Sequence, residues 1–238
     1  MSNDREGSRD ACEHTQSTAR EGGGAPSYRP RRPSPLGGRK PTTADLPEFA
    51  VDDPDSIDDL LPIPELPLRM LIVGVNPGLW TAAVNAPFAR PGNRFWPSLH
   101  AAELTPRRVD AGTGLDDEDA EAFVRAGMGL TNLVGRATTR ADELTAEELR
   151  AGGHRLVERI SGPDPELRPR VVAIAGITAY RTAFGDKKAR LGRQDTAGIE
   201  GWPDGIELWV VPQPSGLNAH ENIDSLAAKW KEVWEASK

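Results

Sequence analysis

The sequence predicts an α/β fold in which a short, mostly parallel sheet carries helices on both faces. Three short apolar runs, each ended by a glycine or a proline, have the pattern of strands buried on both sides: residues 69–73, 171–175 and 208–211. Helical patterns fill the stretches between these runs. Strands that alternate with helices are typical of parallel sheets.

The expected helices are indicated by capping residues and by apolar spacing. Residues 145–148 (TAEE) form a capping-box pattern, which predicts a helix that runs to about Ile160. Thr178 is predicted to cap a short helix. Apolar residues at helical spacing predict further helices around residues 95–99 and over residues 223–234.

Residues 1–66 are expected to lie outside the folded domain, which should span residues 67–238. Residues 1–50 have almost no large apolar side chains, so they bury too little surface to offset the entropy of ordering. The Arg-Pro cluster at residues 29–33 is compatible with a contact to nucleic acid, but a solvated tail is the simpler interpretation. Residues 51–66 form an acidic lead-in.

The charge of the chain gives a mixed indication about nucleic acid. The net charge of −7 argues mildly against strong non-specific binding to DNA. Six acidic side chains and one arginine lie in residues 51–70, so this stretch alone has a net charge of −5. A local basic face elsewhere is compatible with the remainder.

Several classes of protein are excluded by the residue counts. A single cysteine, Cys12, rules out a disulfide framework and a cysteine-ligated metal or iron–sulfur site, and we expect no metal or cofactor. No glycine-rich nucleotide-binding motif follows a strand. No apolar stretch is long enough to span a membrane, and the N-terminus lacks a secretory signal. We expect an intracellular monomer, cytoplasmic with the nucleoid in a bacterium or nuclear in a eukaryote.

Two loops at the predicted strand ends are the candidate site, because ligands of α/β sheets bind beyond the carboxyl ends of the strands. Residues 74–78 (GVNPG) and residues 212–218 (PQPSGLN) each contain one amide side chain, Asn76 and Gln213. Amides orient and polarise a ligand but are not bases near neutral pH. From composition alone, simple tight turns are an equally good interpretation.

Four segments add a more specific indication. They are GVNPGLWTAAVNAPFARPGNRFW (74–96), GLTNLVGRATTRADELTAEELRAGGHRLVERI (129–160), the strand VVAIAG with its helix, and the loop PQPSGL. In this order they resemble the mismatch-specific uracil-DNA glycosylase and thymine-DNA glycosylase family of the uracil-DNA glycosylase superfamily. The resemblance implies a three-layer α/β/α sandwich, a base flipped out of the duplex and hydrolysis of its N-glycosidic bond to leave an abasic site.

The resemblance also implies roles for residues of the first loop. Asn76 matches the residue that positions the attacking water, which suits a reaction in which the base leaves as an anion. Phe88 matches the ring that stacks on the extruded base, with a position in the core as the alternative. The implied base pocket comprises Gly74, Val75, Pro77, Gly78, Thr81 and Phe88.

The second loop matches the segment that enters the duplex and fills the hole left by the base. It departs from the family, in which the loop begins with Asn or Met and its wedge ends in Arg, because this chain has Gln213 and His220 there. The implied loop residues are Gln213, Pro214, Ser215, Gly216, Leu217, Asn218 and His220. Candidate phosphate contacts, each equally compatible with a solvated position, are Arg90, Arg94, Lys187, Lys188 and Arg190.

Other branches of the superfamily fit the sequence less well. The uracil-specific branch has an Asp in the first motif and a His in the second, and the iron–sulfur branches need four cysteines. The leading hypothesis is a monofunctional, metal-independent glycosylase that acts on uracil in double-stranded DNA, preferably opposite guanine. The alternatives are a non-catalytic binder of damaged or abasic DNA and an enzyme that acts on a free nucleoside.

Overall fold

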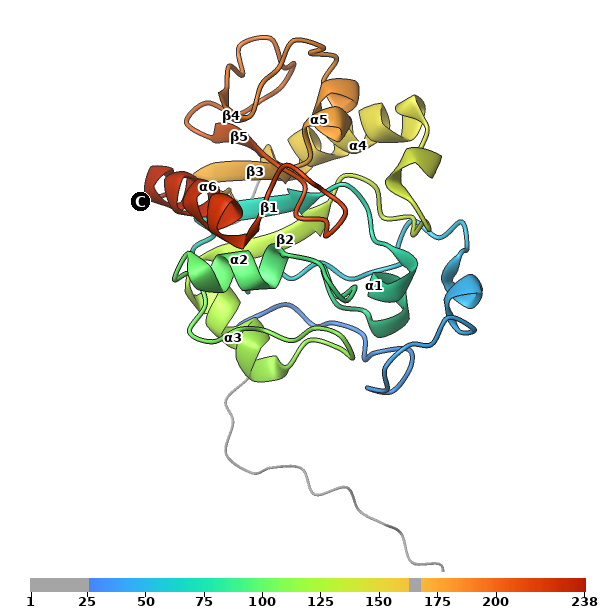
Figure 1. Cartoon of the computed structure of the whole chain (residues 1–238). Helices are drawn as coiled ribbons and strands as arrows, with labels where there is room; N and C mark the ends of the chain where they lie inside the picture. Colours follow the sequence, from blue (N-terminus) through green and yellow to red (C-terminus); the bar gives the residue numbers. More distant parts are fainter. Residues whose placement is uncertain (1–25, 163–167) are drawn as a thin grey trace, which may run out of the picture.

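The computed structural model describes residues 26–162 and 168–238, and within these ranges five strands form one sheet (Figure 1). The order across the sheet is β2-β1-β3-β5-β4. The strands are β1 (Met70–Gly74), β2 (Met128–Asn132), β3 (Val171–Ala175), β4 (Gly192–Gln194) and β5 (Glu207–Val211). Only β4 runs antiparallel to its neighbour. The predicted α/β fold with a mostly parallel sheet is confirmed.

Helices cover both faces of the sheet, as expected (Figure 1). One face carries α2 (Phe95–Ala101), α3 (Asp117–Arg125) and α6 (Ile223–Ala236), and the other carries α4 (Ala146–Ile160) and α5 (Ile177–Ala183). The helix α1 (Leu79–Val84) and two short 3-10 turns, Leu46–Phe49 and Ala141–Glu143, complete the elements. Successive β1 residues alternate between the two faces, which divides the core into two apolar layers.

The helix α4 begins where its capping box predicts. Thr145 accepts a hydrogen bond from the backbone of Glu148, whose carboxylate accepts one from the Thr145 backbone in return. A methyl group on Gly152 would lie 2.3 Å from the carbonyl oxygen of Leu133, so this glycine permits close packing of α4 on the segment after β2. The predicted cap of α5 is wrong by two residues, because Gly176 is the N-cap and Thr178 lies within the helix.

Residues 26–66 depart from the predicted disordered tail, because they pack against the domain. Leu60 is fully buried and exchanges two backbone hydrogen bonds, of 2.8 and 3.0 Å, with Leu130 of β2. Ion pairs add to this anchorage, and one of them joins Asp59 to Arg159 of α4 at 2.6 Å. Averaged composition concealed the few apolar residues that hold the segment. The rest of the predicted tail, residues 1–25, lies outside the described residues.

Over the ranges that the structure describes, no helix combines the length and the apolar character that crossing a bilayer requires.

Candidate active site

A cleft of 820 Å³ opens beyond the carboxyl ends of the parallel strands. Both predicted loops line it, together with residues from the segment after β2 and from the lead-in. A larger hollow of 1110 Å³ lies between the lead-in and α4 and shares Asn132 with the cleft. The smaller cleft is the better candidate site, because both glycine-rich loops line it together with the predicted amides of Asn76 and Gln213.

The amide of Asn76 has a fixed orientation. Its Nδ2 donates hydrogen bonds to Thr138 Oγ1 at 2.7 Å, to the Arg136 carbonyl at 3.0 Å and to the Pro77 carbonyl at 3.1 Å. Two of these partners are carbonyl oxygens, which only accept, so the nitrogen must occupy this position. The side-chain oxygen Oδ1 is therefore left as the acceptor that Asn76 offers to a ligand or a water.

The backbone of the first loop is also tied down. Hydrogen bonds of 2.9, 3.0 and 3.1 Å join the N–H groups of Leu133, Val134 and Thr138 to the carbonyl oxygens of residues 74, 75 and 77. These bonds extend the contact between β1 and β2 beyond the ends of both strands. A loop held at three of its five residues in this way keeps its one polar side chain in place.

Asn132 is a site residue that sequence reasoning did not identify. It ends β2 directly opposite Gly74 of β1 and lines the cleft. A methyl group on Gly74 would lie 2.3 Å from Asn132 Oδ1 and 3.5 Å from the tip of the Phe88 ring. The absence of a side chain at Gly74 therefore makes room for the Asn132 amide and the Phe88 ring beside it. The available signal was an asparagine in the second matched segment.

Phe88 has one ring face on the core and lines the cleft. Its ring stacks on that of Phe95, with centroids 3.9 Å apart and planes inclined by 22°. The backbone φ of +55° lies in the left-handed region, which is costly for a bulky residue and is common at functional sites. The two interpretations from sequence, core residue and presented ring, both describe part of its environment. Thr81 is 6% exposed and also lines the cleft.

The second loop is exposed and has its own turn structure. Leu217 is 84% exposed, the largest fraction among the exposed large apolar side chains of the described residues. The Asn218 side chain donates to the Gln213 carbonyl at 3.1 Å, and the Asn218 backbone donates to the Ser215 carbonyl at 3.0 Å. His220 is exposed, and its backbone donates to Asn218 Oδ1 at 3.1 Å. The loop therefore exposes the apolar side chain of Leu217, while local hydrogen bonds fix the backbone on either side of it.

Arg94, a predicted phosphate contact, makes its contacts within the protein instead. Its guanidinium donates to four carbonyl oxygens of the second loop region, and the closest are those of Glu221 at 2.6 Å and Asn218 at 2.7 Å. The Arg94 backbone donates to the Pro214 carbonyl at 2.8 Å. With most of its N–H groups engaged, this side chain holds the loop rather than a phosphate.

The other candidate phosphate contacts are exposed, and only Arg90 lines the cleft. Lys187, Lys188 and Arg190 lie on the turn that precedes β4. Gly192 pairs with Val210 near the carboxyl end of β5, so this turn approaches the end of the sheet that carries the cleft.

Negative charge borders the cleft through Asp58, Asp59 and Asp142. Burial alone would raise the pKa of Asp58, but hydrogen bonds from the Arg32 backbone and from Asn85 lower it below its ordinary value. This carboxylate is therefore ionised at neutral pH. No group of three or more His, Cys, Asp or Glu side chains suited to a metal ion occurs in residues 26–162 and 168–238.

The sequence model of the family described as "UDG: Uracil DNA glycosylase superfamily" matches residues 63–237. This range contains the whole sheet, α1 to α6 and both loops of the cleft.

Proposed function

The chain belongs to the uracil DNA glycosylase superfamily, and from this premise we propose that it releases uracil from double-stranded DNA, preferably from G·U mismatches. Membership indicates a DNA glycosylase, a hydrolase that acts on DNA, in general. The proposal adds a monofunctional mechanism, the mismatch preference and activity on related damaged pyrimidines. The observation that carries it is the Asn76 amide, whose nitrogen is fixed by three acceptors while its oxygen remains available.

The proposed reaction is a hydrolysis of a flipped-out nucleotide. Asn76 Oδ1 accepts a hydrogen bond from a water, which places the water oxygen against C1′ of the sugar. The water oxygen bonds to C1′ as the bond from C1′ to N1 of the base breaks. The bonding electron pair leaves with uracil, and the proton released by the water neutralises the uracil anion. An amide is sufficient here, because the step needs orientation and charge stabilisation more than proton abstraction.

Recognition of the base is assigned to Phe88 and Asn132. A ring that stacks on Phe95 of the core and also lines the cleft suits stacking of a pyrimidine, which offsets part of the cost of leaving the helix stack. An amide carries a donor and an acceptor side by side, as does the uracil edge formed by N3–H and O4. Asn132 therefore complements that edge.

The absence of lysine among the cleft-lining residues of the described ranges supports a monofunctional reaction. A glycosylase that also cleaves the DNA strand needs an amine to form a Schiff base with the sugar. With water as the nucleophile, the product is an intact strand that carries an abasic site.

The decisive experiment measures release of labelled uracil from a G·U duplex in the presence of EDTA. Wild type is expected to release uracil under single-turnover conditions, and Asn76→Ala is expected to do so on the order of 10²-fold more slowly. Gln194→Ala, which removes an amide from β4 outside the cleft, is the matched control and should retain the wild-type rate. Full activity in Asn76→Ala would refute the role of this residue.

The opposite-base preference needs a duplex panel, because the second loop departs from the family at Gln213 and His220. Release from G·U should exceed release from A·U, and equal rates would reject the mismatch preference. The acidic border at Asp58 and Asp59 favours one alternative, a binder of damaged DNA without catalysis. Tight binding to uracil-containing duplex with no release on long incubation would establish that alternative.

A further inference from the structure

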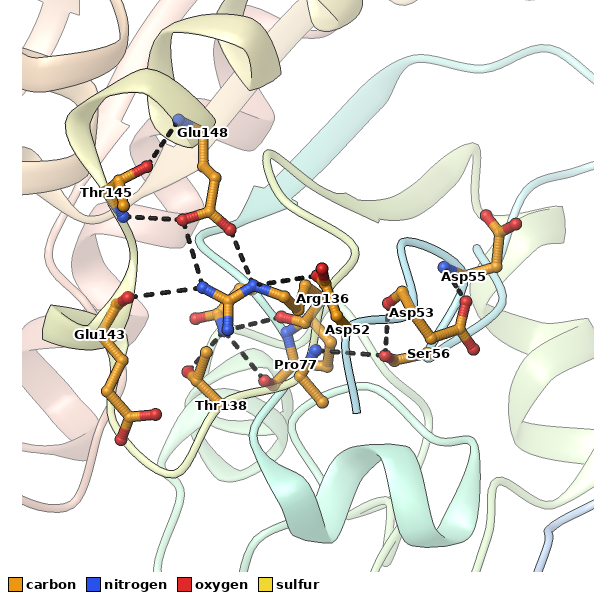
Figure 2. A network of polar contacts seen from close by, with 12 residues as sticks. Asp52, Asp53, Asp55, Ser56, Pro77, Arg136, Thr138, Glu143, Thr145 and Glu148 are labelled. Carbon is orange, nitrogen blue, oxygen red and sulfur yellow. Dashed lines mark hydrogen bonds and ion pairs between the residues drawn. The ribbon is translucent and has the colours of Figure 1, made fainter. Parts of the chain in front are cut away.

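The fixed orientation of Asn76 depends on a segment that is itself held by an ion pair. Two of the three acceptors around Asn76 Nδ2 belong to Arg136 and Thr138, which follow β2. The position of this segment therefore sets the direction in which the Asn76 amide points. Figure 2 shows the polar contacts around Arg136.

The Arg136 guanidinium contacts the first turn of α4. Its Nε and Nη2 donate to the two carboxylate oxygens of Glu148 at 2.7 and 3.2 Å, a bidentate geometry that fixes both partners. Nη2 also donates to the Glu143 carbonyl at 3.4 Å (Figure 2). Arg136 thus supplies its carbonyl oxygen to Asn76 and its guanidinium to the first turn of α4.

Glu148 is a rigid anchor for this pair. It lies in the first turn of a 15-residue helix, and its carboxylate also accepts a hydrogen bond of 2.8 Å from the Thr145 backbone. The two charged side chains are 23% and 28% exposed, so solvent competes with the pair only in part. The hydrogen bond from Arg136 is the main cause that lowers the pKa of Glu148, to about 2, so the pair stays ionised at neutral pH.

The opposite side of the segment is supported mainly by neutral contacts. The backbone of Ala137 donates to Ser56 Oγ at 3.1 Å, and Gly135 packs directly against the Pro54 carbonyl. Asp52 is 3.8 Å from Arg136 but its side chain is 96% exposed, so it adds little. These contacts keep the segment on the domain, whereas the pair with Glu148 fixes its direction.

We propose that Arg136 and Glu148 form a positioning pair that orients the Asn76 amide and so sets the rate of the chemical step. This inference rests on the proposed glycosylase function. Neither side chain touches the reacting atoms, and both act through the carbonyl oxygen of residue 136 and the hydroxyl of Thr138. Loss of the pair lets the segment shift, and a shift of a few tenths of an ångström to an ångström at the water-orienting oxygen is costly to a hydrolysis.

The test is a Glu148→Gln variant, which keeps side-chain length and the capping box but removes the charge. The rate of uracil release under single-turnover conditions is expected to fall on the order of 10-fold, with the Kd for duplex unchanged. Glu147→Gln removes the same charge from the preceding residue, which is exposed and does not contact Arg136, and should match wild type. Arg136→Lys, which retains the charge, should be faster than Arg136→Met.

A double-mutant cycle separates positioning from a general structural role. In an Asn76→Ala background, Glu148→Gln should reduce the residual rate by less than about twofold, because the group through which it acts is gone. A further 10-fold fall in that background, or a wild-type rate in Glu148→Gln alone, would overturn the proposal.

A second measurement decides the inference even if the wild type releases no uracil, the result that would refute the proposed function. The Asn76 side-chain N–H resonances are identified in NMR spectra by their loss in Asn76→Ala. Their exchange with water should be at least several-fold faster in Glu148→Gln than in wild type and in Glu147→Gln. If the chemical shifts of these resonances and their exchange rates are the same in Glu148→Gln as in wild type, the positioning role is overturned independently of activity.

Discussion

The two loops of the cleft are held in opposite ways. The first, residues 74–78, is tied to the segment after β2 by three backbone hydrogen bonds and by the Asn76 side chain. The second, residues 213–220, is largely exposed, is folded by local turns and is tethered by Arg94. A loop that orients a water needs fixed atoms, whereas a loop that enters a duplex needs a side chain that nothing else has already covered.

This contrast predicts that changes in the first loop lower the rate of the chemical step and that changes in the second weaken binding. Single-turnover kinetics at several enzyme concentrations separate the two quantities, kmax and Kd.

The largest effect is expected for Gly74→Ala. The added methyl group would lie 2.3 Å from Asn132 Oδ1, so it pushes the amide out of the cleft, and kmax should fall on the order of 10²-fold with little change in Kd. Gly216→Ala is the matched change in the second loop, where the methyl group would lie 2.5 Å from the Gly92 carbonyl. That variant should raise Kd and leave kmax nearly unchanged. The reverse pattern would contradict the division between the loops.

A smaller effect is expected for Arg94→Met, which removes the donor to four carbonyl oxygens of the second loop region. We expect a Kd for duplex about 30-fold weaker, or about 2 kcal/mol, because the loop no longer keeps the shape in which it binds DNA. Arg90→Met is the control for loss of one positive charge at the cleft. An equal loss of affinity in the two variants would indicate a shared contact with phosphate instead.

Leu217→Ala should lower activity on double-stranded DNA alone. The side chain is 84% exposed, so its removal should change the free energy of unfolding by less than about 0.5 kcal/mol. Release of uracil at limiting enzyme should fall about 5-fold on duplex, because the side chain no longer fills the space left by the base. On single-stranded DNA, where no stack needs refilling, the variant should match wild type. An equal fall on both substrates would refute the insertion role.

The smallest effect concerns the pH dependence of stability at Glu148. Its pKa is lowered to about 2 in the folded protein, so the ion pair stabilises fully above the ordinary carboxyl range and is lost as the pH falls toward 2. The difference in Tm between wild type and Glu148→Gln should be a few degrees at pH 7, since a partly exposed pair contributes about 1 kcal/mol at most. That difference should shrink below about pH 4.5. A constant difference down to pH 3 would be inconsistent with the lowered pKa.

Sequence reasoning succeeded where one short stretch decides the structure by itself. Uninterrupted apolar runs predicted three of the four parallel strands, and the pattern from Thr145 to Glu148 placed the start of α4. It missed β2, whose sequence MGLTN is interrupted by a glycine and two polar residues. A methyl group on Gly129 would lie 2.9 Å from the Leu68 side chain. The glycine is therefore required by a residue that packs on the strand, and the sequence of the strand alone does not indicate this.

The candidate site, like the sheet, was predicted only in part. Asn76 and the two loops follow from strand ends, but Asn132 ends the strand that was missed, so its position opposite Gly74 depends on the strand order. The role of Arg94 was also out of reach, because composition does not distinguish an arginine that faces solvent from one that binds carbonyl oxygens. Both depend on contacts between residues far apart in the chain.

The pairing of Leu60 with Leu130 bears on how separate molecules meet. β2 is the outermost parallel strand, and the free backbone groups of such a strand can recruit a strand from another molecule. Leu60 occupies both hydrogen-bonding groups of Leu130 from that side, and it precedes the matched residues 63–237. Leu60 therefore covers the middle of this edge, and a chain begun at residue 63 would leave the two backbone groups of Leu130 free to pair with a strand of another molecule.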